Sequence, residues 1–391
     1  MKICLINNLY YPFTRGGAEQ VVKNIAEGFK ADGQDVFIIS SRPLFRRVDK
    51  KINGIKTVRF FPWNIFWVGN INRYQAFFRL VWHFFDVFNF YSFLKVRAIL
   101  KKEKPDLVIT HNLKGIGYLV PLAVKSLGIK YFHTIHDVQL VNPSGLIIAG
   151  KEDSWDNKCI LTKIYQKINK ILFSYPQVLI SPSKWLMDFY CDKGFFKKAR
   201  KSIIPNPAPN IKSPTASYQL PATNKLLYIG QLENHKGILF LIEALSELGE
   251  DYELLIAGSG NKESIIKEQV KKNDKIKFLG KIENKEVLDL YNKVSLTIVP
   301  SLCYENSPMV IYESLAAGTP VLASNIGGVG ELIVEGENGY TFTPGNKKDF
   351  LEKIKIFLRS REKLPQMKRK AFDSISRHTV ENYLRKIKDH L

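Results

Sequence analysis

A chain of 391 residues is longer than one ordinary α/β domain requires and long enough for two. Its apolar runs fall short of the ~18 to 20 residues that cross a bilayer, so we expect no membrane-spanning helix. Its four cysteines are scattered and form no C-x-x-C pair. We therefore expect neither a zinc knuckle nor a disulfide framework, and a reducing, cytoplasmic location.

The formal net charge of +21 is divided unevenly along the chain. Residues 1–205 contain 32 Lys and Arg against 14 Asp and Glu, a net +18, whereas residues 206–391 contain 26 against 23, a net +3. An excess confined to one half indicates that this half faces an anionic partner. Nucleic acid, anionic lipid and a phosphorylated acceptor all fit that description.

Short β-branched or apolar runs alternate with longer amphipathic ones, which predicts βαβ units and parallel sheets in an α/β fold. The first set of strands is expected at residues 2–7, 35–40, 106–111, 130–136 and 178–181. Three prolines at 205–209 then forbid both helix and interior strand, so we interpret this segment as an interdomain hinge. The second set is expected at residues 225–230, 253–257, 275–280, 296–300, 320–324 and 340–343.

At the start of the chain, Arg15, Gly16 and Gly17 follow the first expected strand and open a helix. Glycines in this position let a backbone approach a phosphate closely, so the three residues are candidates for donor binding. The alternative is that the glycine pair only forms a turn.

Two histidines, His133 and His136, lie three residues apart at the end of an expected strand. Residues so spaced point to opposite faces, so one ion could not easily bind both and we expect no metal site. His111, at the end of the preceding strand, is either a neighbour of His136 in the same site or a structural histidine. Residues 138–158 then form a long loop, and loops of that length often carry function.

Aromatic residues crowd the segment 63–93, and core packing and an interfacial surface both stay open for them. They follow a basic cluster made of Arg42, Arg46, Arg47, Lys50, Lys51, Lys56 and Arg59. We hypothesise that this half docks on an anionic membrane, with Trp63, Phe66 and Trp67 inserting at headgroup depth. The alternative is a basic surface that keeps the protein soluble, beside a buried aromatic cluster.

The most informative segment, residues 300–321, follows an expected strand and reads PSLCYENSPMVIYESLAAGTPV. Ser307 suits the N-cap of a helix and Pro308 suits its first position. The amides of Met309 and Val310 would then point out of the helix start, together with the positive end of its dipole. Such a helix start is a ready site for a diphosphate.

Within this segment, Glu305 and Glu313 lie eight residues apart and are followed by A-x-G-x-P-V. The pattern resembles family 4 of the retaining glycosyltransferases, which have the GT-B fold of two Rossmann-like domains facing across a cleft. The resemblance implies that Glu313 holds ribose hydroxyls and Glu305 holds hydroxyls of the donor sugar, with Asn306 and Ser307 beside them. The alternative is a pair of solvated surface carboxylates.

After the hinge, residues 230–237 resemble the family's G-R-L-x-x-x-K-G segment. This implies that Lys236 contacts the donor diphosphate, whereas the alternative is a surface lysine. Gln231 stands where the family usually has arginine, and we hypothesise that Arg15 replaces the missing charge, with His235 as a weaker candidate. Residues 327–331 resemble a further segment of the family, whose role can be purely structural.

The resemblance covers nearly the whole chain and implies an acceptor-binding domain at residues 1–205 and a nucleotide-sugar-binding domain at 206–371. A terminal helix at about 372–391 packs back on the first domain. In this interpretation His136, Lys236 and Glu305 are catalytic, and His136 faces the donor sugar.

The implied reaction moves a hexosyl unit from a nucleotide-diphosphate sugar to an acceptor hydroxyl with retention, and it requires no metal and no cofactor. We expect the acceptor to be a lipid-linked glycan in polysaccharide or cell-envelope glycan biosynthesis. The enzyme would then be peripheral on the inner face of the plasma membrane.

Two other functions remain as alternatives. A nucleotide-sugar 2-epimerase can share the GT-B fold, but the chain shows no convincing added set of acid and base carboxylates. A nucleic-acid-binding protein would explain the basic half alone. The chain lacks a recognition motif with interleaved aromatic residues, so we expect no nucleic-acid partner.

Overall fold

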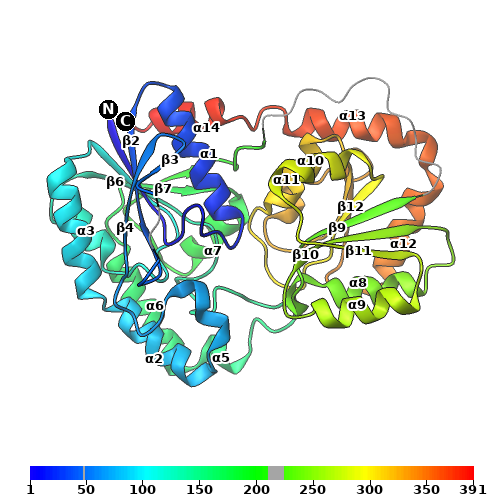
Figure 1. Ribbon diagram of the computed structural model, residues 1–391, viewed down its shortest axis with the longest axis horizontal. Coiled ribbons are helices and arrows are strands. Elements are labelled where there is room, and N and C mark those ends of the chain that lie inside the picture. Colours follow the sequence, from blue (N-terminus) through cyan, green and yellow to red (C-terminus); the bar gives the residue numbers. More distant parts are fainter. Residues whose placement is uncertain (47–48, 210–223) are drawn as a thin grey trace. The chain divides into compact units, whose positions relative to one another are not determined.

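The computed structural model describes residues 1–46, 49–209 and 224–391 (Figure 1). The chain forms two compact units. Unit 1 comprises Met1–Leu146, Asp153–Pro207 and Val380–Leu391, and unit 2 comprises Ile147–Glu152 and Ala208–Thr379. The change from unit 1 to unit 2 after Pro207 falls within the expected hinge.

Unit 1 is built on a sheet of eight strands, counted over its described residues, in the order β3-β4-β2-β1-β5-β6-β7-β8. Neighbours are parallel except for the β3–β4 pair. The strands are β1 (Lys2–Ile6), β2 (Asp35–Ser41), β3 (Lys51–Ile52), β4 (Ile55–Phe60), β5 (Leu107–Thr110), β6 (Lys130–Thr134), β7 (Val178–Ser181) and β8 (Arg200–Ile203). β1, β5 and β7 are buried almost throughout. Such continuous apolar strands are typical of a parallel sheet with both faces covered.

Helices cover this sheet, and the last of them comes from the end of the chain. They are α1 (Gly17–Ala31), α2 (Ala76–Val87), α3 (Phe90–Glu103), α4 (Val120–Lys125), α5 (Trp155–Lys158), α6 (Ile160–Leu172), α7 (Lys184–Asp192) and α14 (Val380–Lys388). α14 packs on α1, where Lys388 forms an ion pair of 2.6 Å with Asp32. Of the segment 372–391, only this final helix belongs to unit 1; the preceding α13 (Leu364–Ile375) belongs to unit 2.

Unit 2 has a six-stranded parallel sheet, within the described residues, in the order β11-β10-β9-β12-β13-β14. Its strands are β9 (Lys225–Gln231), β10 (Glu253–Ser259), β11 (Ile276–Gly280), β12 (Leu296–Val299), β13 (Val321–Ser324) and β14 (Gly339–Phe342). Its other helices are α8 (Ile238–Ser246), α9 (Glu263–Lys272), α10 (Asn284–Asn292), α11 (Met309–Ala316) and α12 (Lys347–Arg359). The order reverses direction between β9 and β12. In open α/β sheets such a switch point is where ligands bind.

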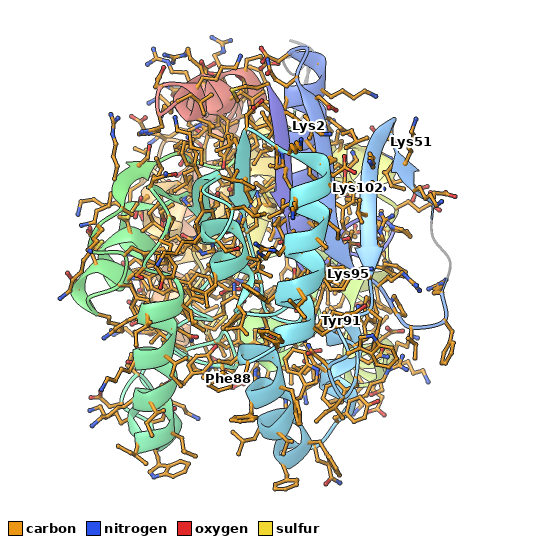
Figure 2. All side chains as sticks on the ribbon, turned by 90° about the vertical axis from the view of Figure 1, so that its left-hand side faces the viewer. Lys2, Lys51, Phe88, Tyr91, Lys95 and Lys102 are labelled. Atoms are coloured by element: carbon orange, nitrogen blue, oxygen red, sulfur yellow. The ribbon has the colours of Figure 1, made fainter. Side chains whose placement is uncertain are left out.

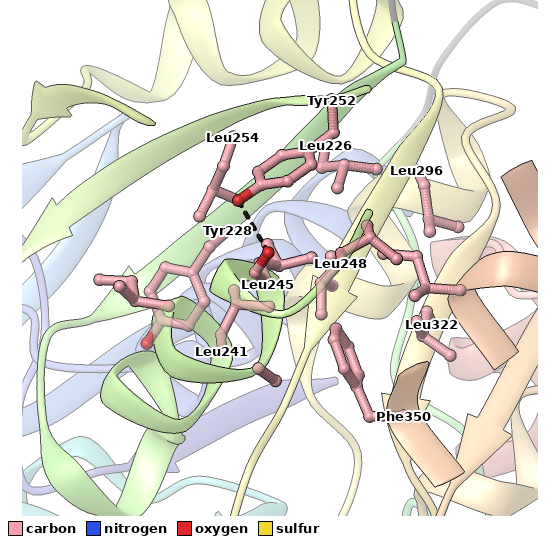
Figure 3. Packing of buried hydrophobic residues seen from close by; sticks show 14 of the residues in the cluster. Leu226, Tyr228, Leu241, Leu245, Leu248, Tyr252, Leu254, Leu296, Leu322 and Phe350 are labelled. Carbon is pink, nitrogen blue, oxygen red and sulfur yellow. Dashed lines mark hydrogen bonds between the residues drawn. The ribbon is translucent and has the colours of Figure 1, made fainter. Parts of the chain in front are cut away.

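One buried apolar cluster of unit 2 lies between the sheet and the helices α8 and α12 (Figure 3). Leu226 of β9 and Leu241 of α8 are fully buried there, as is Phe350 of α12. The hydroxyl of Tyr252 donates to the backbone oxygen of Leu245 at 3.0 Å, so this buried polar group is satisfied (Figure 3).

Both units are doubly wound α/β folds, which confirms the expected fold class. Each strand expected from the sequence is present, with ends that differ by one or two residues. The strands β3, β4 and β8 were not anticipated. β3 is only two residues long, and β8 is the polar run Arg200–Ile203, so neither has the apolar pattern that identifies a strand.

The aromatic segment divides between core and surface. Phe66 is buried between the rings of Tyr74 and Trp82, and the indole of Trp82 donates to the backbone oxygen of Phe66 at 2.6 Å. Trp67 packs edge-on against Phe13 and donates to a serine hydroxyl of β2. The hypothesis that Phe66 inserts into a membrane is therefore wrong, because its ring is buried, whereas Trp67 is half-buried and its insertion stays a prediction. Trp63, the third residue of that hypothesis, is exposed, and so are Tyr74, Phe77, Phe78, Phe84, Phe85, Phe88, Phe90 and Tyr91.

The expected basic cluster is also partly engaged within unit 1. Arg59 donates to the backbone oxygens of Asp49 and Tyr11, and Lys56 is paired with Glu103 at 2.6 Å. Arg47 lies outside the described residues. Among the helices that the structure describes, none is long and apolar enough to span a membrane.

Candidate active site

The loop between β12 and α11 carries Glu305, as the sequence predicted. One oxygen of its carboxylate, Oε1, accepts a hydrogen bond from the Ser301 hydroxyl at 2.9 Å and lies 2.5 Å from Nζ of Lys236. Lys236 ends a 3₁₀ turn, Asn234–Lys236, that directly follows β9. Two residues that are 69 positions apart therefore meet at the carboxyl ends of neighbouring strands.

The backbone holds these two loops together at a very short separation. Gly237 has φ of 74°, and a Cβ atom on it would lie 1.7 Å from the backbone oxygen of Pro300. The amide of Leu302 donates to the backbone oxygen of His235 at 2.9 Å. Glycine is required at position 237 both for the left-handed conformation and for this close approach.

The ion pair fixes the charges of both partners. Burial alone would raise the pKa of Glu305, but the ammonium of Lys236 and the Ser301 hydroxyl bring it below its ordinary value. Burial likewise opposes the charge of Lys236, and the carboxylate of Glu305 raises its pKa above the ordinary value. Burial and the same carboxylate raise the pKa of Cys303 to about 12. The thiol beside the pair is therefore neutral and not a nucleophile.

Glu313 lies on α11, also as predicted; its side chain is half-buried and takes no part in this ion pair. Its Oε2 accepts a hydrogen bond from the Tyr291 hydroxyl of α10 at 3.1 Å. Burial raises the pKa of Glu313 to about 7, although the tyrosine hydrogen bond opposes the shift. Additional hydroxyl donors would stabilise the ionised form of this carboxylate and lower its pKa again.

The start of α11 differs slightly from the prediction. The helix begins at Met309 with Pro308 at the N-cap position, one residue later than expected. Ser307 is not the cap; its hydroxyl lies 2.7 Å from that of Tyr312. The shift leaves Met309 and Val310 in the first turn, where backbone amides have no intrahelical acceptor. The asparagine at 306 is buried in the preceding loop.

Gly327 and Gly328 support the Glu305 loop from behind. A Cβ on Gly327 would lie 2.1 Å from the backbone oxygen of Glu305, and the Gly328 amide donates to that oxygen at 2.9 Å. The glycine-rich segment 327–331 therefore positions the loop through its backbone, which agrees with a structural role.

A second support comes from a segment that sequence reasoning did not connect with this site. Residues 147–152, inside the long loop expected at 138–158, belong to unit 2. The Ala149 amide donates to the backbone oxygen of Leu302, and the Tyr304 amide donates to that of Ile147, both at 2.9 Å. The Tyr304 hydroxyl also donates to Glu152 at 2.9 Å. These contacts join residues that are far apart in the sequence, so no local sequence pattern predicts them.

In unit 1 the glycine pair opens α1 as expected. The amide of Gly16 donates to the buried side chain of Glu19 at 2.8 Å, so this amide already has an internal carboxylate as its partner. Arg15 lines a hollow of about 270 Å³ together with Phe13 and Trp67. Binding of a phosphate by Arg15, Gly16 and Gly17 stays a prediction.

The histidines separate into a pair and a single residue. Nδ1 of His111 lies 2.9 Å from Nε2 of His136, and the two rings stack with centroids 5.2 Å apart. His133 instead accepts or donates a hydrogen bond with Thr110 at 2.7 Å and packs against Phe173. His133 and His136 thus contact different groups, in agreement with the predicted opposite orientations.

Burial makes the histidine pair neutral at physiological pH. It lowers the pKa of His136 to about 4, and the pKa of His111 falls well below its ordinary value because of burial and the neighbouring ring. Nε2 of His111 has no hydrogen-bond partner among the described residues. His111 is fully buried, so it can orient His136 but is not itself exposed to a ligand.

Lys114 and Asp137 lie beside the histidines, and sequence reasoning did not single them out. Lys114 Nζ donates to the backbone oxygen of Pro143 at 2.7 Å, and burial lowers its pKa to about 8. Burial raises the pKa of Asp137 to about 6. In the part of the chain that the structure describes, no three His, Cys, Asp or Glu side chains are grouped to hold a metal ion.

Two family models match consecutive parts of the chain. The model described as Glycosyltransferase Family 4 matches residues 15–209, and that described as Glycosyl transferases group 1 matches residues 216–374. An uncharacterized 42.6 kDa protein in the cps region of Klebsiella pneumoniae is 31% identical over 335 residues, which cover 85% of this chain and 87% of that protein. A glycogen synthase of Mycobacterium tuberculosis is 25% identical over 365 residues, 88% of this chain and 83% of that enzyme.

Solved structures match along the full length. Sucrose-phosphate synthase from Thermosynechococcus elongatus aligns with a TM-score of 0.79 at 19% identity, over 100% of this chain and 98% of that chain. The Anabaena protein HepE in complex with UDP aligns with a TM-score of 0.73 at 17% identity, over 100% and 99% of the two chains. HepE is also known in complex with UDP-glucose. At these identities the likeness shows a shared fold.

Proposed function

The chain belongs to glycosyltransferase family 4 and has the GT-B fold, and we propose that it transfers a hexosyl unit with retention from a nucleotide-diphosphate sugar to an acceptor hydroxyl. The observation that carries the proposal is the convergence of Lys236, Glu305 and the first turn of α11 at the switch point of unit 2. A cation, a carboxylate and a helix start are the groups that recognise a diphosphate joined to a sugar.

Each group has a distinct task in the proposal. Lys236 and the amides of Met309 and Val310 bind the diphosphate, and Glu313 accepts hydrogen bonds from the ribose hydroxyls. Glu305 accepts hydrogen bonds from the donor sugar through the oxygen atom that Lys236 does not contact. His136, neutral and held by His111, is assigned to the same sugar.

The reaction is driven by stabilisation of the leaving group. Negative charge grows on the diphosphate as the glycosidic bond breaks, and fixed donors stabilise that charge without reorganising. The acceptor oxygen attacks from the face that the diphosphate leaves, forms the new bond to the anomeric carbon and gives its proton to a phosphate oxygen. We propose that Lys236 and the helix start suffice for this step, without a metal ion.

The proposed acceptor is a lipid-linked glycan used in polysaccharide or cell-envelope glycan assembly, reached from the inner face of the plasma membrane. Its support is the net charge of +18 on residues 1–205, since lipid diphosphates and the surrounding anionic lipids are both attracted by such a domain.

The donor is tested first by thermal shift with a panel of nucleotide sugars in the presence of EDTA. A ligand at 100 times its dissociation constant stabilises the folded protein by ~2.7 kcal/mol, which is readily measured. The best donor is then incubated with and without lipid-linked acceptors while nucleotide diphosphate is quantified. Release that depends on an acceptor supports transfer, whereas formation of an epimeric nucleotide sugar without acceptor would contradict it.

A further inference from the structure

Helix α6 exposes an aliphatic face to solvent, whereas a helix on the surface of a soluble domain normally buries such a face. Two of its uncharged polar residues point inward: Tyr165 donates to the backbone oxygen of Gln139 at 2.7 Å, and buried Asn169 donates to that of Leu140 at 3.0 Å. Its outward stripe is aliphatic and consists of Ile160, Leu161, Ile164 and Ile171, all exposed. The side chain of Ile160 is 68% exposed.

Helix α2 has the same peculiarity. Trp82 and Asp86 face the interior, whereas Phe77 and Phe84 are 69% and 62% exposed. The exposed apolar side chains of this helix and of the residues after it are Phe77, Phe78, Leu80, Phe84, Phe85, Phe88, Phe90, Tyr91 and Leu94. A soluble helix places polar residues at such positions, so an apolar partner is expected to cover them.

Both helices pack on the same loop of unit 1. The backbone oxygen of Asp86 in α2 accepts from the Tyr118 amide at 3.1 Å, and the Tyr165 hydroxyl of α6 lies 3.2 Å from the Tyr118 hydroxyl. Figure 2 shows Phe88 and Tyr91 at one end of α3, where α2 begins to extend away, and Lys102 at the other end. We call the outer faces of α2 and α6 the apolar face.

Basic residues outnumber acidic ones in the two segments that carry the apolar face. Residues 73–95 contain Arg73, Arg79 and Lys95, and their sole acidic residue, Asp86, is buried. Residues 160–171 contain Lys163, Lys167 and Lys170 and no acidic residue. Apolar side chains between cations are typical of surfaces that lie at the boundary between lipid headgroups and acyl chains.

We propose that the apolar face docks unit 1 on an anionic lipid membrane, with the phenylalanines of α2 and the isoleucines of α6 inserted below the headgroups. Lys163, Lys167 and Arg79 then contact lipid phosphates. A second copy of the chain fits less well, because pairing two such faces would bring like charges together. The docking itself is independent of the donor site, and its use for a lipid-linked acceptor rests on the proposed function.

This surface differs from the one expected from sequence. In Figure 2, Lys51 of the basic cluster lies toward the end of unit 1 that also holds Lys2, away from Phe88. Variants that remove lysines of the segment 42–59 are therefore matched controls for variants that remove lysines of α6. Lys50 and Lys51 are both exposed, as are Lys163 and Lys167.

The test is flotation of the full chain, without donor, on vesicles of phosphatidylglycerol and phosphatidylethanolamine or of phosphatidylcholine alone. We expect binding to the anionic vesicles that falls with salt. The pair K163S/K167S should weaken it at least tenfold, whereas K50S/K51S should change it less than twofold. The set F77S/F84S/I160S/I164S should abolish binding even at low salt, whereas I265S/V334S, exposed apolar residues of unit 2, should not.

Three results would overturn the proposal. One is recovery of the wild-type chain in the unbound fraction with anionic vesicles at low salt. Another is equal binding by the quadruple variant. The last is a wild-type dimer, measured by analytical ultracentrifugation, that the quadruple variant dissociates. Circular dichroism and unchanged thermal shift by the donor nucleotide show that the variants are folded. Vesicle binding without any sugar transfer would leave the docking intact and contradict only the proposed function.

Discussion

Nζ of Lys236 lies 2.5 Å from Oε1 of Glu305, and this contact joins the ends of two neighbouring strands. Both side chains are largely withdrawn from water, so each is the counterion that allows the other to remain charged. Replacing Lys236 alone and replacing both partners should therefore have different effects on stability. The comparison of the two variants separates a structural role of Lys236 from a role in catalysis.

We expect K236M to lower the transfer rate at least 100-fold, because the leaving diphosphate loses a fixed cation. The same variant should be destabilised by about 3 to 5 kcal/mol, since the Glu305 carboxylate is left without a counterion. The double variant K236M/E305Q should regain stability but not activity. Urea unfolding and nucleotide release measure the two effects separately.

The control is K281M, which removes an exposed lysine of unit 2 that follows β11. It should change neither stability nor rate. If K236M/E305Q recovered transfer along with stability, Lys236 would be a purely structural residue.

Glu313 provides a pH dependence with two opposite signs. In the free protein its pKa of about 7 lies above the unfolded value, so the folded state holds a proton that the unfolded state has lost between these values. Its contribution to stability is therefore present at low pH and lost as the pH rises through about 7. Nucleotide diphosphate binds the ionised form, so affinity should rise ~30-fold between pH 5.5 and 8.

Calorimetry between pH 5.5 and 8 tests this, with E313Q as the matched variant because the nucleotide's own phosphate also titrates. E313Q should bind with a weaker affinity whose remaining pH dependence is that of the phosphate alone. It should also gain stability relative to wild type as the pH rises. Identical pH profiles for the two proteins would contradict the assignment of Glu313 to the ribose.

The sequence was sufficient to predict where Lys236, Glu305 and Glu313 lie in unit 2, because the signals that place them are local. A strand, a turn ending in Lys236, and a helix start preceded by Glu305 can each be recognised within about ten residues. Parallel strands then bring their carboxyl ends to one edge of the sheet, so the meeting of Lys236 and Glu305 follows from topology.

What the sequence could not show depends on contacts between distant residues. The bridge from residues 147–152 to the Glu305 loop has no repeating pattern, and its three residue pairs are more than 150 positions apart. The sequence also could not show which residues of the aromatic segment are exposed. Phe66 and Phe77 are equally apolar, and only packing decides which of them is buried. Helix α6 has the periodicity of an ordinary amphipathic helix, so the sequence could not show that its aliphatic face is turned to solvent.

The missing arginine at Gln231 yields a prediction of compensation. We expect R15A to lower the catalytic rate by more than ~10-fold, which corresponds to about 1.4 kcal/mol of transition-state stabilisation. Q231R should restore part of that rate in the R15A background, because the guanidinium again supplies a fixed cation to the diphosphate. Steady-state kinetics of the two single variants and the double variant measure the coupling; strictly additive effects, with no rescue, would exclude the compensation.

The histidine pair predicts a rate change without a change in nucleotide affinity. H136A should reduce kcat at least tenfold while leaving the dissociation constant of the nucleotide diphosphate unchanged, since that ligand lacks the sugar. H111F retains a stacked ring but removes the hydrogen bond to His136, and should lower kcat to a smaller extent. Because the pKa of His136 is about 4, the protonation state of this residue should not change the rate between pH 6 and 8. Weaker nucleotide binding by H136A would argue for a general structural role instead.

Gly237 predicts a purely structural defect at the same site. Alanine there must accept φ of 74° and displace the backbone oxygen of Pro300, which would otherwise lie 1.7 Å from the new Cβ. Strain in the backbone and the forced separation of the two loops should together cost about 2 to 4 kcal/mol of unfolding free energy. The displacement also moves the turn that ends in Lys236, so nucleotide affinity should fall as well. G249A is the matched control, because a Cβ atom on Gly249 would meet no other atom within 4 Å and the backbone there has no positive φ. Equal urea midpoints for G237A and G249A would show that the two loops can separate without penalty, and that their close contact does not position Lys236.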